Sequence, residues 1–246
     1  SRTTIYESHV GLGAAYLNNV ATEVRVAEGA LLRHRKLQNE TKDGYHIAAT
    51  TVSLDGRAKY ENYALNAGGR LARNEIHVAF RGPEANCDLY GAYIGRGSQH
   101  IDTTTFVDHA VPECTSREVY KGALDDNARG VFQGKILVRK DAQKTDGHQL
   151  NKVLLLSEGS EIDAKPELEI YADDVKCSHG ATAGELDEEQ LFYLRARGIK
   201  EAEARDLLVA AFLEDSLELI DDETPRDAFR NVISNWLAMR RRQEEG

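Results

Sequence analysis

The chain has 246 residues, a net charge of −10 and 41% apolar residues, a composition that suits one or two folded domains. The negative charge argues against nucleic acid and against an anionic membrane surface as partners, because both need a basic footprint. Its apolar runs, such as 153–156, are too short to cross a bilayer. Cys87, Cys114 and Cys177 show no CxxC spacing, so we expect no disulfide framework and a cytoplasmic protein.

Residues 1–184 show the alternation of apolar and polar residues that is typical of strands with one buried face. Ile76-His77-Val78-Ala79-Phe80 and Leu168-Glu169-Ile170-Tyr171 are clear examples, and no convincing helical period interrupts them. The sequence starts at Ser1 within such a pattern and without Met, so we expect that an N-terminal portion has been removed.

Turn residues punctuate these strands, for example at Asp55-Gly56, Gly82-Pro83 and Glu158-Gly159. After Asp55 such marks recur about every 13 to 17 residues, a longer interval than the roughly eight to twelve residues of a meander. Two such units make a coil of about thirty residues, which favours a β-helix that winds without helical crossovers. A jelly roll, which also explains alternation and turns, is the alternative.

The spacing of apolar residues changes from a strand period to a helical period at Leu186. We therefore place a boundary between a β-helix core at 1–184 and a helical domain at 185–246. Asp187 and Gln190 predict an N-capped helix that runs through Arg197, with Gly198 after its end. A second helix is expected over 201–213.

The second of these helices has a predicted apolar face that consists of Ala204, Leu207, Leu208, Ala211 and Phe212.

A third helix is expected to start at Thr224-Pro225, with Thr224 as its N-cap and Pro225 in its first turn. Its apolar stripe consists of Phe229, Val232, Ile233, Trp236 and Leu237. The segment 185–246 carries 16 acidic against nine basic residues. That charge suits either a solvated cap on the solenoid or a docking surface for a basic partner, and the two are compatible because a helix has two faces.

Cys177 and His179 form the candidate site, because residues i and i+2 of a strand point to one face. A thiolate beside an imidazole suits iron, zinc or copper, although buried cysteines are usually inert. Three widely spaced cysteines cannot by themselves provide the four ligands of a structural zinc site or an iron–sulfur cluster. The pair Cys177 and His179 therefore forms at most part of a metal site, and its missing ligands would come from another chain.

Other polar groups give weaker signals. Asp146 and His148, two residues apart, could be an acid–base pair, but hydrogen bonding across a turn is the commoner role. The acidic pairs Asp125-Asp126 and Asp173-Asp174 could belong to a carbohydrate-active β-helix enzyme, although Asp is frequent at turns. No nucleophile elbow, P-loop, HExxH or dinucleotide fingerprint is present.

A long stretch of the sequence resembles the SufB/SufD family, the scaffold proteins of the SUF iron–sulfur cluster assembly machinery. The resemblance rests on Lys144-Thr145-Asp146, on the run from Ile162 through Tyr171-Ala172-Asp173-Asp174-Val175-Lys176-Cys177-Ser178-His179-Gly180-Ala181-Thr182, and on Leu186 through Ile199. Gly180 follows His179 where SufB-type chains tend to have Glu, which resembles SufD and removes one carboxylate.

The resemblance implies a right-handed parallel β-helix followed by a small helical domain, acting as a non-enzymatic scaffold. It implies pairing with SufB through the β-helices, with His179 and Cys177 at an interface where a transient iron–sulfur cluster forms and none is held stably. It also implies that the SufC ATPase binds the C-terminal helices, and a homodimer is the alternative for the isolated chain. The contacts that we expect on these helices are Leu191, Phe192, Leu194, Leu207, Leu208 and Phe212.

Overall fold

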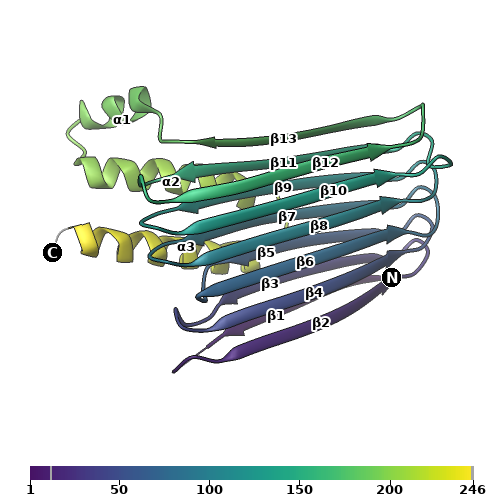
Figure 1. Cartoon of the computed structure of the whole chain (residues 1–246), viewed down its shortest axis with the longest axis horizontal. Helices are drawn as coiled ribbons and strands as arrows, with labels where there is room; N and C mark the ends of the chain where they lie inside the picture. The colour runs from purple at the N-terminus through teal and green to yellow at the C-terminus, as the bar shows by residue number, and fades with distance from the viewer. Residues whose placement is uncertain (12, 245–246) are drawn as a thin grey trace.

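The computed structural model describes residues 1–11 and 13–244, and most of these residues form a parallel β-solenoid (Figure 1). Successive strands alternate between two sheets, so each pair of strands completes one coil. The strands within the described residues are β1 (Arg2–Val10), β2 (Leu17–Val26), β3 (Leu31–Asn39), β4 (Tyr45–Leu54), β5 (Lys59–Asn66), β6 (Leu71–Phe80), β7 (Asn86–Gly95), β8 (His100–His109), β9 (Thr115–Leu124), β10 (Arg129–Val138), β11 (Asp146–Leu155), β12 (Glu161–Ile170) and β13 (Lys176–Gly184).

The register of the solenoid confirms the predicted coil length. Leu31 pairs with Lys59, Lys59 with Asn86, and Asn86 with Thr115, at intervals of 28, 27 and 29 residues. The odd-numbered strands form a seven-stranded sheet in chain order, and the even-numbered strands form a six-stranded sheet. The β-helix is therefore correct and the jelly roll is wrong, because every pairing between neighbouring strands is parallel.

The interior of the solenoid is built by the alternation seen in the sequence. Within β6, Ile76, Val78 and Phe80 are buried, whereas His77 between them is exposed. Equivalent positions on neighbouring strands stack into columns, and the apolar columns merge into one core cluster that includes Leu54, Tyr60 and Phe132. Burial of such columns is the main stabilising contribution in a fold whose coils contact only their neighbours.

Three helices follow the last strand: α1 (Glu188–Arg195), α2 (Glu201–Leu217) and α3 (Glu223–Glu244). The predicted cap of α1 is confirmed, since the Asp187 carboxylate accepts hydrogen bonds from the backbone N–H groups of Glu189 and Gln190. Gly198 has the positive φ of 86° expected after the end of this helix.

The predicted cap of α3 is wrong, because the helix begins before Thr224. Asp222 supplies the capping oxygen instead and accepts the Thr224 N–H at 3.3 Å. The same carboxylate accepts a hydrogen bond from the hydroxyl of Tyr6 on β1. The start of α3 is therefore set by Asp222, which also contacts the first strand, and not by the local Thr224-Pro225 signal in the sequence.

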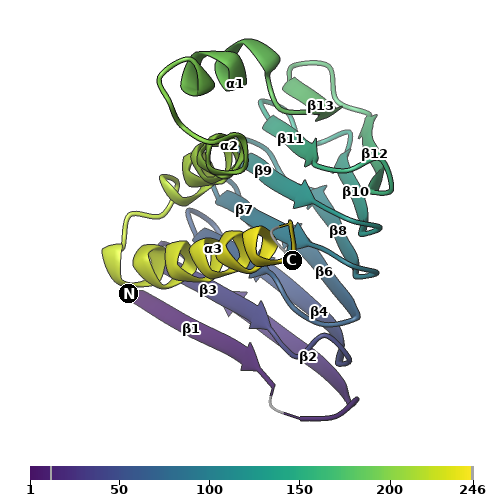
Figure 2. The ribbon, with the colours of Figure 1, turned by 90° about the vertical axis from the view of Figure 1, so that its left-hand side faces the viewer.

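Helices α2 and α3 lie over the outer face of the seven-stranded sheet, and α1 lies at the β13 end of the solenoid (Figure 2). A second apolar cluster forms between sheet and helices, where Tyr63 of β5 stacks on Phe229 of α3 at 5.2 Å between ring centroids. The predicted stripe of α3 is confirmed, because Phe229, Ile233, Trp236 and Leu237 are all buried. No helix within the described residues is both long and apolar enough to span a membrane.

The predicted apolar face of α2 is wrong in part. Ala204 is buried as expected, but Val209 and Leu213 are buried in place of Leu207 and Ala211, which are exposed. The helix is rotated because it also presents polar groups inward. The hydroxyl of Ser216, for example, lies 2.9 Å from that of Tyr63.

Both ends of the solenoid have edge strands with one unpaired side. At one end these are β1 and β2, and at the other they are β12 and β13. β12 carries Pro166, which pairs in register with Gly134 of β10, whereas β13 contains no proline. Unpaired strand edges offer free N–H and C=O groups to another chain.

Candidate functional site

Cys177 and His179 lie on β13, the edge strand of the seven-stranded sheet. In the parallel register with β11, Cys177 pairs with Gly147 and His179 with Gln149. Gln149 is buried inside the solenoid, so both residues of the pair are on the inward face of the last coil. The structure therefore brings Cys177 and His179 together at the open end of the solenoid, as the sequence predicts.

The two side chains differ in exposure. Cys177 is half-buried and packs against the apolar core, whereas His179 is exposed. Burial raises the pKa of the Cys177 thiol, which the backbone N–H of Gly147 lowers in part. Among the described residues, no three His, Cys, Asp or Glu side chains are placed to hold a metal ion, so the pair is an incomplete set of donors.

The space beneath Cys177 is tightly packed, and the next residue in its column is Gly147. A Cβ atom at Gly147 would lie 3.3 Å from Ser116 Oγ and 3.7 Å from Cys177 Sγ. Ser116 is fully buried and lies 2.9 Å from His109 Nε2. Burial lowers the pKa of His109 to about 4, so its ring is neutral at pH 7.

A buried polar pair lies beneath His179. Gln149 Nε2–H donates a hydrogen bond to Glu118 Oε1 at 3.2 Å, and Glu118 occupies the register position next to Gln149 on β9. Burial raises the pKa of Glu118 to about 7, while the neighbouring Thr105 and Gln149 side chains act in the opposite direction. The only signal of this pair in the sequence is a polar residue at an interior strand position, which does not predict the contact.

On the outer face of the same strands lies a second line of polar groups. His148 Nε2 lies 2.8 Å from Asp146 Oδ1, and His148 also hydrogen-bonds to Ser178. Arg117 binds the same carboxylate at 2.9 Å and is the main reason why its pKa is lowered. Asp146 thus stays ionised in an ion pair between β9 and β11, and the hydrogen bond of His148 to Ser178 extends this line of polar groups to β13. Such contacts between neighbouring strands are structural.

The acidic pairs of the enzyme alternative lie at turns, and the first pair has structural partners. Asp125 Oδ2 is 2.6 Å from Arg240 Nε, and Asp126 accepts the Gly97 N–H at 2.8 Å. Asp173 and Asp174 lie in the exposed turn before β13. The contacts of Asp125 and Asp126 are typical of structural residues at turns.

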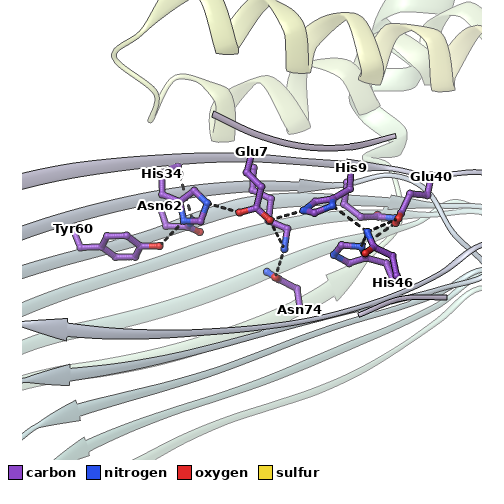
Figure 3. A network of polar contacts seen from close by, with 11 residues as sticks. Glu7, His9, His34, Glu40, His46, Tyr60, Asn62 and Asn74 are labelled. Carbon is purple, nitrogen blue, oxygen red and sulfur yellow. Dashed lines mark hydrogen bonds and ion pairs between the residues drawn. The ribbon is translucent and has the colours of Figure 1, made fainter. Parts of the chain in front are cut away.

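A polar network fills the first coils at the opposite end of the solenoid (Figure 3). The Glu7 carboxylate binds His34 Nε2 at 2.6 Å and Lys36 Nζ at 3.5 Å, and these partners hold its pKa well below the ordinary value although burial opposes them. His46 Nδ1 lies 3.0 Å from Glu40 Oε2.

The sequence does not predict this network, because its histidines are scattered along the chain. In the fold they meet because β1, β3 and β4 place them on facing interior positions, for example His9 and His46 with ring centroids 4.7 Å apart. Burial, with repulsion by Lys36, lowers the pKa of His46 to about 4.

The helical residues predicted to dock a partner are not all available on the surface. Leu191 is buried, and Phe212 is half-buried beneath Lys121, whose Nζ lies 4.7 Å from the ring centroid. Phe192 on α1 and Leu207 on α2 are 74% and 47% exposed, so these two can contact another chain directly. Leu194 and Leu208 are half-buried.

The comparisons with known proteins point to one family. The family model described as "SUF system FeS cluster assembly, SufBD core domain" matches residues 1–212. The iron–sulfur cluster assembly protein SufD of Escherichia coli K12 is 36% identical over 224 residues, or 91% of this chain and 53% of its own length.

Two further relatives have similar coverage. An iron–sulfur cluster assembly SufBD family protein of Synechocystis is 34% identical over 219 residues, or 89% of this chain and 48% of the relative. The chloroplastic protein ABCI7 of Arabidopsis thaliana is 36% identical over 225 residues, or 90% and 47%. The chain spans about half the length of these relatives, and it belongs to the SufBD core family of the SUF iron–sulfur cluster assembly system.

Proposed function

We propose that this chain is a non-enzymatic scaffold subunit on which an iron–sulfur cluster is assembled together with a SufB partner. The observation that carries the proposal is the position of Cys177 and His179 on β13, an edge strand with one unpaired side. A partner strand that pairs there brings its own side chains next to these two donors. The cluster is cargo in this proposal and is shared between the two chains.

The incomplete donor set supports the same proposal. A nascent cluster that must later be transferred is better served by ligands divided between two chains than by a closed set of four. His179 is the exposed member of the pair and can approach a partner directly, whereas Cys177 is drawn toward the core. We therefore propose His179 as the main contributor from this chain and Cys177 as its neighbour.

The test uses co-expression of this chain with SufB and SufC, followed by anaerobic analysis of iron and sulfide in the purified complex. We expect His179→Ala to leave the fold and the complex intact and to lower cluster content at least tenfold. His148→Ala is the matched control, because His148 lies on the neighbouring strand but on the outer face. A normal cluster content in His179→Ala would refute the role of this histidine.

We further propose that the SufC ATPase docks on α1 and α2, around Phe192 and Leu207, and that its hydrolysis of ATP drives a rearrangement of the SufB interface. These two apolar side chains are exposed on neighbouring helices, and exposed large apolar groups are typical of docking surfaces. Deleting the helices is an unsuitable test, because they cover Tyr63 and Ala92 of the sheet.

Point substitutions separate docking from folding. We expect Phe192→Ser with Leu207→Ser to abolish co-purification of SufC while the melting temperature stays unchanged. Leu219→Ser is the control, since Leu219 is also exposed but lies beyond the end of α2. Undiminished binding of SufC by the double variant would contradict this docking surface.

A further inference from the structure

We propose that Gln149 is the positioning residue of His179, which accepts the imidazole N–H through its Oε1 while Glu118 holds the amide in place. The proposal rests on the role of His179 given above, but it concerns only this chain. It is carried by three observations: the register of three strands, the fixed orientation of one amide, and one acceptor atom without a partner.

The register puts the three side chains in one column. Glu118 on β9 pairs with Gln149 on β11, and Gln149 pairs with His179 on β13. Residues in register on neighbouring parallel strands point to the same face about 4.8 Å apart. Gln149 is therefore the nearest interior side chain to His179 along the sheet.

The amide of Gln149 is held in one orientation from two sides. Its Nε2–H donates to Glu118 Oε1 at 3.2 Å, so the carbonyl oxygen must point away from that carboxylate. From the facing sheet, Gly134 leaves the space that the amide fills, since a Cβ atom there would lie 2.0 Å from Nε2 and 2.8 Å from Oε1. A fixed amide presents its acceptor at a fixed place.

The acceptor itself is unsatisfied. Gln149 is 2% exposed, and within the described part of the chain its Oε1 has no hydrogen-bond partner. Buried polar atoms of this kind usually have a partner, and this acceptor is therefore available to an N–H group of the neighbouring His179 ring. No hydrogen bond of the His179 ring is present in the described structure, and an exposed side chain can change its rotamer within nanoseconds.

The chemical consequence concerns the tautomer of His179. If one ring nitrogen donates to Gln149 Oε1, the other must carry the lone pair and is directed out of the solenoid toward the unpaired edge of β13. Histidines that bind metals are commonly oriented by such a hydrogen bond from their second nitrogen. Gln149 would thus set which nitrogen of His179 is offered to the cluster.

The experiment is ¹⁵N-edited NMR of the histidine rings in the isolated chain, with the His179 signals assigned by His179→Gln. We expect one dominant tautomer of His179 in the wild type, and a mixture of both in Gln149→Met, which keeps the volume but removes the amide. Glu118→Gln preserves an acceptor for the amide and should retain the wild-type tautomer. Gln133→Met, at an exposed outward position of β10, is the control that should change nothing.

Each result decides the proposal. Identical His179 signals in wild type and Gln149→Met would overturn the proposal. An even mixture of the two His179 tautomers in the wild type would also overturn it, and that measurement requires no variant. If Gln149→Met fails to fold, the wild-type tautomer and its retention in Glu118→Gln give the answer. If the tautomer shifts as expected while His179→Ala still assembles clusters normally, the positioning stands and the proposed function of His179 fails.

Discussion

Arg240 on α3 and Asp125 in the turn after β9 form a buried ion pair, with 2.6 Å between Nε and Oδ2. Arg240 is 5% exposed and also binds Asp206 of α2 at 3.1 Å, so one guanidinium joins the solenoid to two helices. Burial raises the pKa of Asp206, and Arg240 opposes that effect. The pair explains why the side chain of Arg240 turns inward near the end of α3.

We expect Arg240→Met to destabilise the protein by about 3–5 kcal/mol, because it leaves the buried Asp125 carboxylate without its cation, whereas Asp206 keeps an ion pair with Arg241 at 2.7 Å. Trp236, the only tryptophan, lies buried on the same helix and reports its undocking by fluorescence during urea unfolding. Arg230→Met is the control, since its ion pair with Glu214 is at the surface and should be worth less than about 1 kcal/mol. An equal loss of unfolding free energy in Arg240→Met and Arg230→Met would contradict the view that the buried pair holds the helices on the solenoid.

Glu118 gives the protein a distinct dependence on pH. Its pKa is raised to about 7 in the folded state, while the unfolded chain titrates near the ordinary value of 4.5. The folded state therefore binds the extra proton between these values, and stability falls as pH rises from 4.5 to 7. We expect Glu118→Gln to remove a penalty of up to about 3 kcal/mol at pH 8 and to change little at pH 4.

The measurement for Glu118 is the free energy of unfolding at pH 4 to 8 in wild type and variant. Glu158→Gln, at an exposed turn, controls for the loss of one negative charge. A constant difference between wild type and Glu118→Gln across this range would show that the buried carboxyl does not titrate in it.

His109 affects the stability of the fold at acid pH. Burial lowers its pKa to about 4 in the folded state, from an ordinary 6.5. The unfolded chain takes up this proton first, so the stability that the neutral ring contributes is lost as pH falls from 6.5 to 4.

We expect His109→Gln to flatten the pH dependence of stability in the acid range by up to about 3 kcal/mol. His77→Gln, at an exposed position of β6, is the control. The measurement is thermal unfolding between pH 4 and 7. If the dependence of stability on acid pH is unchanged in His109→Gln, the loss of stability at low pH comes from other groups, such as the network around His46.

Gly122 is required by its neighbour in the core. A Cβ atom at this position would lie 2.2 Å from the ring of Tyr93, which is fully buried and donates a hydrogen bond to Asn151. We expect Gly122→Ala to destabilise the protein by about 1–3 kcal/mol through overpacking. Gly56→Ala, whose nearest contact is 3.6 Å, should be close to neutral in the same denaturation experiment.

The sequence predicts the β-helix because strand alternation and turn spacing are local signals that the coils repeat. It also predicts that Cys177 and His179 share a face, which follows from a period of two along one strand. The Glu118–Gln149 pair and the histidine network of Figure 3 could not be predicted, because their members come from different coils. The apolar face of α2 was misjudged because Ser216 and Asp206 face inward through polar partners on the sheet and on α3.

The two edge strands at the site end are not equivalent as templates. A proline within a sheet is tolerated where its nitrogen faces away from the neighbouring strand, so Pro166 interrupts the row of donors on the outer side of β12. β13 has a full set of N–H groups. The strand that carries Cys177 and His179 therefore has the more regular edge at this end of the solenoid.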